Sequence, residues 1–366
     1  MSDAPFGGVF EGARVLVTGH TGFKGSWLTN WLLTMGAEVC GYSREVPTEP
    51  SLHELSGVAR RIEDVTGDIR DGARFRSVVE SFRPDFVFHL AAQAIVSTSY
   101  ADPVETMSVN VVGTASVLDA LRHVRHPCVA VIITSDKCYD NVEWPWGYRE
   151  TDALGGKDVY SGSKGGAELA FRSFFFSFFK DHPVRMATTR AGNVIGGGDW
   201  AADRIVADCV RAWQKGERVQ IRSPAATRPW QHVLEPLSGY LTLAQAMRED
   251  ATLAGESFNF GPRAEQNARV IDLLGDLGRV WGLNEQDSYE ITGNIPFHEA
   301  GLLKLNCDKA LLRLRWQPTL SYDECVGMTG GWYRDVIRDG KDASEATHAD
   351  IAAYHRLATA RRQVWA

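Results

Sequence analysis

In the first half of the chain, short apolar runs alternate with longer segments that have helical periodicity. Runs that predict buried strands occupy residues 14–18, 38–42, 85–93 and 129–133. In the last of these, from Val129 to Ile133, the apolar residues are continuous, as in a parallel sheet that is covered on both faces. Helical segments follow the runs up to about residue 190, for example Trp27 to Met35 closed by Gly36. The pattern predicts an α/β fold with a doubly wound parallel sheet.

The second half is less regular, as expected where long insertions build a lobe from loops. We expect a Rossmann domain over residues 1–190 and a smaller, mixed α/β substrate-binding lobe over residues 191–340, interleaved with the first domain. Residues 341–366 would form a C-terminal helical tail, in which 350–362 is predicted to be an exposed helix.

A glycine-rich turn links the first predicted strand to the first predicted helix. Its sequence is Gly19-His20-Thr21-Gly22-Phe23-Lys24-Gly25, a GxxGxxG spacing. Glycines allow the backbone to turn tightly and to approach a pyrophosphate, which the amides at the helix N-terminus then bind. The turn therefore predicts a dinucleotide site at Gly19, Thr21, Gly22, Phe23, Lys24 and Gly25.

The second strand is followed by Tyr42, Ser43 and Arg44, where an acidic residue commonly binds the adenosine ribose. Tyr42 and Ser43 are candidate cofactor contacts. Arg44 could accept a 2′-phosphate and favour NADP, or it could be a solvated loop arginine.

Two further segments are candidates for cofactor binding. Asp68 and Ile69 lie in a turn that resembles one that contacts adenine, although Asp68 could instead cap a helix beginning near Asp71. The predicted strand at 85–93 ends in small residues at Leu90-Ala91-Ala92, which would let a flat cofactor lie against the backbone.

Polar residues follow the predicted strand at 129–133, and a tyrosine and a lysine lie four residues apart beyond the next loop. The strand ends in Thr134-Ser135-Asp136-Lys137, at the sheet edge where open parallel sheets bind ligands. On a helix, Tyr160 and Lys164 share one face. An ammonium beside a phenol favours the phenolate, a plausible base for a sugar or alcohol hydroxyl. Taken alone, the same spacing also fits a surface helix.

Net charge and cysteine usage limit the partners and the cellular compartment that we expect for the chain. The chain has 366 residues and a formal net charge of −7 without a basic block, so nucleic acid is not an expected partner. The six cysteines form no CxxC pair, so neither disulfides nor a metal site are expected. This cysteine usage favours a protein of the reducing cytosol. Residues 171–179 are Phe-rich but too short and too charged to span a membrane. Phe171, Phe175 and Phe178 form a stripe that is expected in the core or at a subunit interface.

Together, these motifs resemble the extended short-chain dehydrogenase/reductases that act on nucleotide sugars. The resemblance rests on Thr18 to Gly25, His89 to Ala92, and Tyr160-x-x-x-Lys164. Within that family the chain is most similar to the dehydratases of CDP-glucose. The segments that carry this closer similarity are the glycine turn continued through Leu28, residues 134–139, residues 190–200 and residues 227–233.

The resemblance implies an NAD-dependent lyase of deoxysugar and O-antigen biosynthesis. Tyr160 would take the proton of the sugar C4 hydroxyl, Thr134 would orient that hydroxyl, and Lys164 would hold the cofactor ribose. The 4-keto sugar would then lose water across C5 and C6, with Asp136 as the acid, and be reduced at C6. Lys137 stands where related dTDP-glucose dehydratases have a glutamate base. It could remove the C5 proton itself, or stabilise the enolate while another group moves the proton.

For the substrate, the resemblance implies that Asn193 binds the diphosphate, and Arg228 is suited to bidentate binding of it. Weaker candidates are Gln93, Asp203, Arg204 and His232, although Asp203 and Arg204 could form only an exposed ion pair. A homodimer or dimer of dimers would use the Phe171 helix and the helix from Pro103 to Leu121. A 4-epimerase, a dehydratase for dTDP or GDP sugars, and a non-catalytic NAD-binding regulator are the alternative functions.

Overall fold

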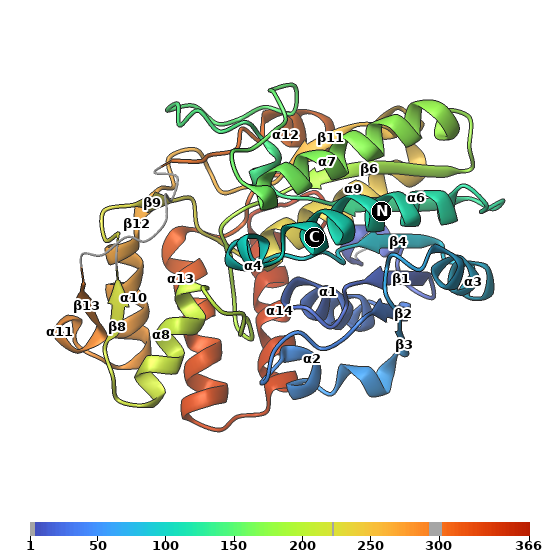
Figure 1. Cartoon of the computed structure of the whole chain (residues 1–366). Helices are drawn as coiled ribbons and strands as arrows, with labels where there is room; N and C mark the ends of the chain where they lie inside the picture. The colour runs from blue at the N-terminus through green and yellow to red at the C-terminus, as the bar shows by residue number, and fades with distance from the viewer. Residues whose placement is uncertain (1–3, 222, 293–301) are drawn as a thin grey trace.

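A seven-stranded parallel sheet lies at the centre of the computed structural model, which describes residues 4–221, 223–292 and 302–366 (Figure 1). The strand order is β11-β6-β5-β4-β1-β2-β3, and every neighbouring pair in this sheet is parallel. The bounds are β1 Arg14–Thr18, β2 Glu38–Ser43, β3 Glu63–Thr66, β4 Phe86–His89, β5 Cys128–Ile133, β6 Val184–Arg190 and β11 Ser257–Asn259. This confirms the predicted doubly wound sheet. The strand order reverses between β1 and β4, which is where such folds open a ligand crevice.

Both faces of the sheet are covered, which explains the continuous apolar runs. One core cluster contains Val129 and Val131 of β5, and the other contains Ala130 and Ile132 of the same strand. Alternate residues of the strand therefore enter opposite layers. The first layer includes α1 (Phe23–Thr34) and α9 (Leu234–Glu249), and the second includes α3 (Gly72–Phe82), α6 (Gly113–Leu121) and α7 (Val159–Phe174).

The second half of the chain contributes to both parts of the molecule. Its helix α9 covers the sheet, and its strand β11 is the edge strand beside β6. A smaller lobe lies beside the sheet in Figure 1. Its elements are α8 (Ile205–Gln214), α10 (Val270–Trp281), α11 (Glu285–Ser288), α13 (Tyr322–Tyr333) and the parallel pair β8 (Val219–Ile221) and β13 (Tyr289–Ile291).

Short elements complete the described chain. Two small pairings are β7 (Val194–Ile195) with β10 (Gln231–His232), and β9 (Thr227–Arg228) with β12 (Ala268–Arg269). The remaining α-helices are α2 (Leu52–Leu55), α4 (Val96–Ala101), α5 (Pro103–Met107), α12 (Asp308–Leu314) and α14 (Ala343–Ala360). Among the helices in the described ranges, none combines the length and apolar character that a membrane crossing needs.

The C-terminal helix is not the exposed tail that the sequence predicts. Ile351, Tyr354 and Ala358 of α14 are buried, and the helix packs against α1. Beyond the helix, Trp365 stacks on Phe6 and on Tyr354 at centroid distances of 5.0 and 5.5 Å. That prediction is wrong because partners far away in sequence cover the apolar face of the helix.

The Phe-rich segment divides between the core and the surface. Phe171 and Phe175 are buried, as predicted, in the layer that covers one face of the sheet. Phe178 is 46% exposed, and the guanidinium of Arg122 lies over its ring at 4.8 Å. The stripe therefore begins in the core and emerges at the surface near its end.

Candidate active site

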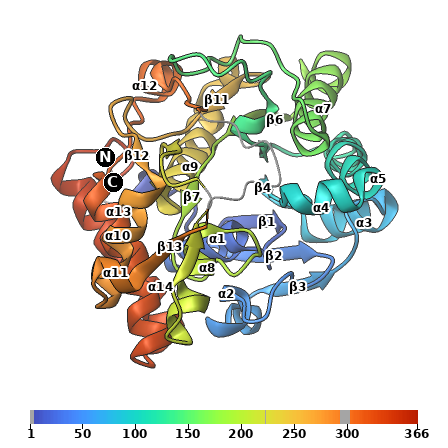
Figure 2. The same ribbon diagram turned by 60° about the vertical axis from the view of Figure 1, so that its left-hand side comes forward.

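The candidate site lies at the carboxyl ends of β1, β4 and β5, and Figure 2 shows α4 and β7 on either side of the first two. The glycine turn, residues 90–93, residues 134–137 and the first turn of α7 meet there. These are the segments in which the sequence placed the cofactor and catalytic residues.

The glycine turn fits a dinucleotide. Gly19 has a φ of +73°, and a Cβ there would lie 2.7 Å from the backbone nitrogen of Ala91. A Cβ on Gly25 would lie 2.1 Å from the carbonyl oxygen of Gly19. Helix α1 begins at Phe23 after Gly22, without a side-chain cap, so its first N–H groups remain available to an anion. The residues present therefore suit a pyrophosphate.

Lysines and an arginine give the crevice a positive character. Burial lowers the pKa of Lys24 to about 8, with the charge of Arg204 acting in the same direction and Asp136 opposing it. Burial also lowers the pKa of Lys164 to about 8. The mutual influence of these groups shows that the cations share one region, which suits the phosphates of a cofactor or a nucleotide sugar.

Near the adenosine end, two predicted contacts have core side chains. Tyr42 is fully buried, and its hydroxyl donates to the carbonyl oxygen of Asp68 at 3.0 Å. The Ile69 side chain packs so tightly that a Cβ on Gly113 would lie 2.7 Å from it. Tyr42 and Ile69 can thus reach a cofactor only through their backbone.

Ser43 and Thr21, also predicted contacts, lie together where β2 meets the glycine turn. The Thr21 N–H donates to Ser43 Oγ at 3.4 Å, and the Thr21 hydroxyl donates to the carbonyl oxygen of Glu45 at 2.7 Å. Residues 90–92 pass the same turn, since the N–H of Leu90 donates to the carbonyl oxygen of Thr18 at 3.1 Å. The predicted contacts from three segments are thereby brought together.

Charged residues form a network beside this end. Hydrogen bonds from Arg70 lower the pKa of Asp68 to about 2. Arg44 binds Glu45 at 2.7 Å and Glu105 at 2.8 Å, so carboxylates already balance its charge. A 2′-phosphate would have to displace them. The alternative that Asp68 caps a helix is wrong, because Asp71 caps α3 by accepting from the N–H of Arg74.

Tyr160 and Lys164 occupy the first turns of α7, which Asp158 caps by accepting from the N–H of Ser161. Both are buried, and Lys164 Nζ lies 5.9 Å from the centroid of the Tyr160 ring. Burial raises the pKa of Tyr160, whereas the charge of Arg204 and a hydrogen bond with Ser135 lower it. Without a bound cofactor, the effect of burial on the pKa of Tyr160 is thus larger than the opposing effects, and the pKa is not lowered as the sequence predicts.

Two adjacent hydroxyls at the end of β5 have different partners. The Thr134 hydroxyl donates to Glu168 Oε1 at 2.5 Å and approaches the carbonyl oxygen of Thr189 at 3.1 Å. The Ser135 hydroxyl donates to Asp136 Oδ1 at 2.9 Å and bonds with Tyr160. Ser135, and not Thr134, is therefore the hydroxyl that contacts Tyr160.

Asp136 and Lys137 form a short 3₁₀ turn, Asp136–Cys138, directly after these hydroxyls. Asp136 is buried against the backbone of Gly192, where a Cβ would lie 1.9 Å from Asp136 Oδ2. Lys137 is half-buried, and no described carboxylate pairs with it. A small cavity beside the pair is lined by Asp136, Gly192, Asn193 and Gln231. The cavity therefore has a buried acid in its wall, and Lys137 is the next residue along the chain.

Four predicted substrate residues lie near this space or above it. Asn193 has a left-handed φ of +52° and lines the cavity, and Arg228 is buried on β9. Asp203 accepts from the Ser97 hydroxyl at 2.5 Å, and Arg204 donates to the carbonyl oxygen of Ala94 at 3.2 Å. These last two bridge to the segment after β4. The alternative of an ion pair between them is not found in the described chain.

Two predicted substrate contacts are corrected. His232 is fully buried against Trp27 at a centroid distance of 5.7 Å, and burial lowers its pKa to about 3. It therefore belongs to the core. The Gln93 amide donates to the Thr106 hydroxyl at 2.8 Å and accepts from the N–H of Ile95 at 2.5 Å, so its side chain orders its own loop.

Sequence reasoning missed Glu168 and Asn110. Glu168 follows Lys164 by four residues and Tyr160 by eight, a helical spacing that is a usable signal. It is buried and binds Arg190 at 2.8 Å. Asn110 lies in a π-helical turn, Ser108–Val112, and donates to Ser163 Oγ at 2.8 Å. π-Turns of this kind often mark functional sites, but the sequence carries no signal of this one.

The sheet, the glycine turn and the Tyr160/Lys164 pair define a Rossmann-fold protein of the short-chain dehydrogenase/reductase class. The model of the family described as GDP-mannose 4,6 dehydratase matches residues 16–329, and the chain belongs to this family.

The chain is similar in sequence or structure to several characterised enzymes. The chain is 46% identical to the CDP-glucose 4,6-dehydratase of Salmonella typhimurium, over 96% of this chain and 98% of that protein. The structure of a dTDP-glucose 4,6-dehydratase from Bacillus anthracis in complex with NAD has a TM-score of 0.73 at 19% identity, and covers 88% of this chain and 97% of its own. A UDP-glucose 4-epimerase from Thermotoga maritima has a TM-score of 0.76 at 22% identity, covering 88% and 99%. Because dehydratases and epimerases share the fold, the fold alone does not choose between them.

Proposed function

We propose that the chain is a hydro-lyase that converts CDP-glucose into CDP-4-keto-6-deoxyglucose and water, with NAD as its cofactor. The observation that carries the proposal is the position of Asp136, which lines the cavity at Gly192, acts electrostatically on Tyr160 and is followed directly by Lys137. An epimerase needs the tyrosine and lysine of α7 but neither an acid nor an amine for elimination. The 46% identity to a CDP-glucose 4,6-dehydratase supports the same reaction and the same nucleotide.

The first step is proton removal at the sugar C4 hydroxyl. NAD, when bound, supplies the hydride acceptor for C4 and the hydride donor for C6. Tyr160 takes the hydroxyl proton, and Ser135, which bonds with Tyr160, orients that hydroxyl. Lys164 holds the cofactor ribose and adds positive charge close to the phenol.

The second step is elimination of water. The C4 ketone acidifies the hydrogen on C5, which Lys137 removes in its neutral form, and Asp136 gives a proton to the leaving C6 hydroxyl. Asn193 and Arg228 bind the diphosphate, the latter through a planar guanidinium suited to phosphate.

The test is incubation of the purified chain with CDP-glucose and no added reductant, followed by mass spectrometry. A loss of about 18 mass units, one water of the proposed elimination, supports the dehydratase. A new isomer of unchanged mass would replace it with an epimerase. The absence of turnover with CDP-, dTDP- and GDP-hexoses, while NAD still binds, would replace it with a cofactor-binding regulator.

We also infer a homodimer, or a dimer of dimers, formed through the surface of α5, α6 and α7. Apolar side chains that are at least 40% exposed gather on these helices and on the turns that join or extend them, namely Val104, Met107, Val112, Leu169, Phe176 and Phe178. Exposed apolar side chains that gather on neighbouring elements often mark a subunit interface. Light scattering should give twice the chain mass or more, and V104E/L169E should give the monomer.

The same proposal places the enzyme in the cytoplasm, in the supply of deoxysugars for O-antigen synthesis. Supporting it, all six cysteines are free and five of them are buried, which suits a reducing compartment.

A further inference from the structure

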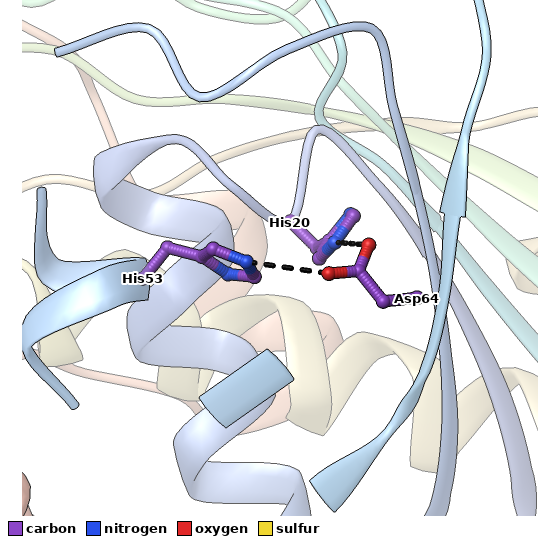
Figure 3. A group of neighbouring side chains, drawn as sticks. All are labelled: His20, His53 and Asp64. Atoms are coloured by element: carbon purple, nitrogen blue, oxygen red, sulfur yellow. Dashed lines mark hydrogen bonds and ion pairs between the residues drawn. The ribbon is translucent and has the colours of Figure 1, made fainter. Parts of the chain in front are cut away.

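A cluster of two histidines and one aspartate lies at the β2–β3 side of the sheet (Figure 3). His20 comes from the glycine turn, His53 from α2 and Asp64 from β3. His20 Nε2 lies 2.9 Å from Asp64 Oδ1, and His53 Nε2 lies 3.4 Å from Asp64 Oδ2. Both imidazoles therefore point at one carboxylate, although the three residues come from separate elements.

The spacing of these atoms suits a metal ion. One donor atom from each residue lies within 4.8 Å of the others. Tetrahedral Zn²⁺ holds nitrogen and oxygen ligands at about 2.0–2.2 Å, which places neighbouring ligand atoms about 3.3 Å apart. The two nitrogen–oxygen distances of 2.9 and 3.4 Å, each to a different oxygen of Asp64, are close to this value. Small side-chain adjustments would therefore complete three ligand positions.

The charges of the cluster also favour a cation. His20 and His53 are buried, at 0% and 4% exposure, and burial lowers the pKa of His20. A neutral imidazole is the form that binds metals. The ion-pairing partners of Asp64 in the described chain are these two histidines, with no lysine or arginine within reach. With neutral histidines, the carboxylate lacks a fixed positive partner.

The surrounding hydrogen bonds allow the required protonation states. His20 Nδ1 lies 2.9 Å from Ser43 Oγ. A serine hydroxyl can donate or accept, so Ser43 can support the tautomer that carries its proton on Nδ1 and leaves Nε2 for a metal. His53 Nδ1 is buried and has no hydrogen-bond partner in the described part of the chain. A proton placed there would break no existing hydrogen bond.

We propose that His20, His53 and Asp64 bind one divalent transition-metal ion, for which Zn²⁺ is the best fit. The side chain of Asp64 is 33% exposed, which leaves room for water at a fourth position. The ion would tie the glycine turn to α2 and to β3. This site takes no part in the proposed dehydration and stands or falls independently of it.

The experiment uses the full chain after treatment with a chelator. Co²⁺ is titrated and followed by visible absorption, Zn²⁺ is then added as a competitor, and the Tm is measured with and without each ion. We expect saturation at one ion per chain, visible bands without a thiolate charge-transfer band, and a higher Tm. Affinity should weaken in acid, because protons compete with the metal for its ligands.

Variants H53Q and D64N should lose the saturable binding and the Tm shift. The matched control is H123Q, because His123 lies 4.0 Å from Asp119 in an exposed pair that has no second histidine. Circular dichroism checks that each variant is folded, and the exposed position of Asp64 makes D64N the milder change. Binding that is absent from the parent chain, unchanged in both variants, or marked by thiolate absorption would overturn the proposal.

Discussion

The Thr134 hydroxyl donates a hydrogen bond to Glu168 at 2.5 Å, and both side chains are buried. Glu168 also accepts from Arg190 and from the Thr188 hydroxyl, each at 2.8 Å. The carboxylate therefore fixes the end of β5 against α7, the helix that carries Tyr160. Ser135 is the neighbouring hydroxyl that forms a hydrogen bond with Tyr160.

Replacing Ser135 should affect chemistry more than stability. We expect S135A to lower kcat by about 10²-fold, on the scale of proton transfers guided by one positioned group, with little change in Tm. T134S should keep most of the activity because it retains the hydroxyl that binds Glu168. The measurement is steady-state turnover of CDP-glucose. Full activity of S135A would show that Ser135 does not orient the substrate hydroxyl.

Replacing Glu168 should act mainly on stability. Burial raises the pKa of Glu168, but the charge and hydrogen bonds of Arg190 outweigh it and leave a net lowering. A lowered carboxyl pKa gives stability that is present above the unfolded value near 4.5 and is lost as the pH falls through the folded value. We expect E168Q to cost about 3–5 kcal/mol at pH 7, the usual effect of removing one partner of a buried ion pair.

Denaturant unfolding measured from pH 7 down to pH 3 checks this expectation. The difference between the parent chain and E168Q should shrink in acid. The control E256Q alters a partly exposed pair with Lys309 and should cost little at any pH. An equal loss for E168Q at every pH would mean that the ionised carboxylate is not the source of the stability.

Local patterns in the sequence were sufficient for much of the fold and part of the site. The run from Val129 to Ile133 predicted a buried parallel strand, and the four-residue spacing of Tyr160 and Lys164 placed both on one face of α7. The glycine turn was found in the same way, because a strand, a turn and a helix occur in immediate succession.

Features that depend on distant partners could not be obtained in this way. Adjacent residues of a strand face opposite sides, but which of Thr134 and Ser135 turns inward depends on Glu168, more than thirty residues away in sequence. The sequence around His232 does not show that this residue is buried, because the side chain that covers it, Trp27, lies about two hundred residues earlier. His232 was therefore predicted to bind substrate. The docking of α14 depends on Phe6 for the same reason.

Replacing Lys137 should separate oxidation from elimination. We expect K137M to lower overall turnover by about 10²-fold or more, because the group that moves the C5 proton is lost, while oxidation at C4 still occurs. Incubation in D₂O checks this, since deuterium should enter C5 with the parent chain and not with K137M. NADH absorbance should also accumulate in the variant. Rapid deuterium entry with K137M would assign the base to another group.

Replacing Arg204 should shift the pH dependence of the first step. Its charge is the largest influence that lowers the pKa of Tyr160 against the effect of burial. Removing that charge raises the pKa of the phenol, so a higher pH is needed before Tyr160 can act as a base. We expect the alkaline-rising limb of kcat/KM to move to higher pH in R204Q, because the phenol then lacks the nearby positive charge.

The control R204K keeps the charge and should keep the pH profile, even if it loses the hydrogen bond to the Ala94 carbonyl. A purely structural role would lower activity equally at every pH and would not separate glutamine from lysine. An unchanged profile in R204Q would instead mean that Lys164 and the bound cofactor set the pKa of the Tyr160 phenol.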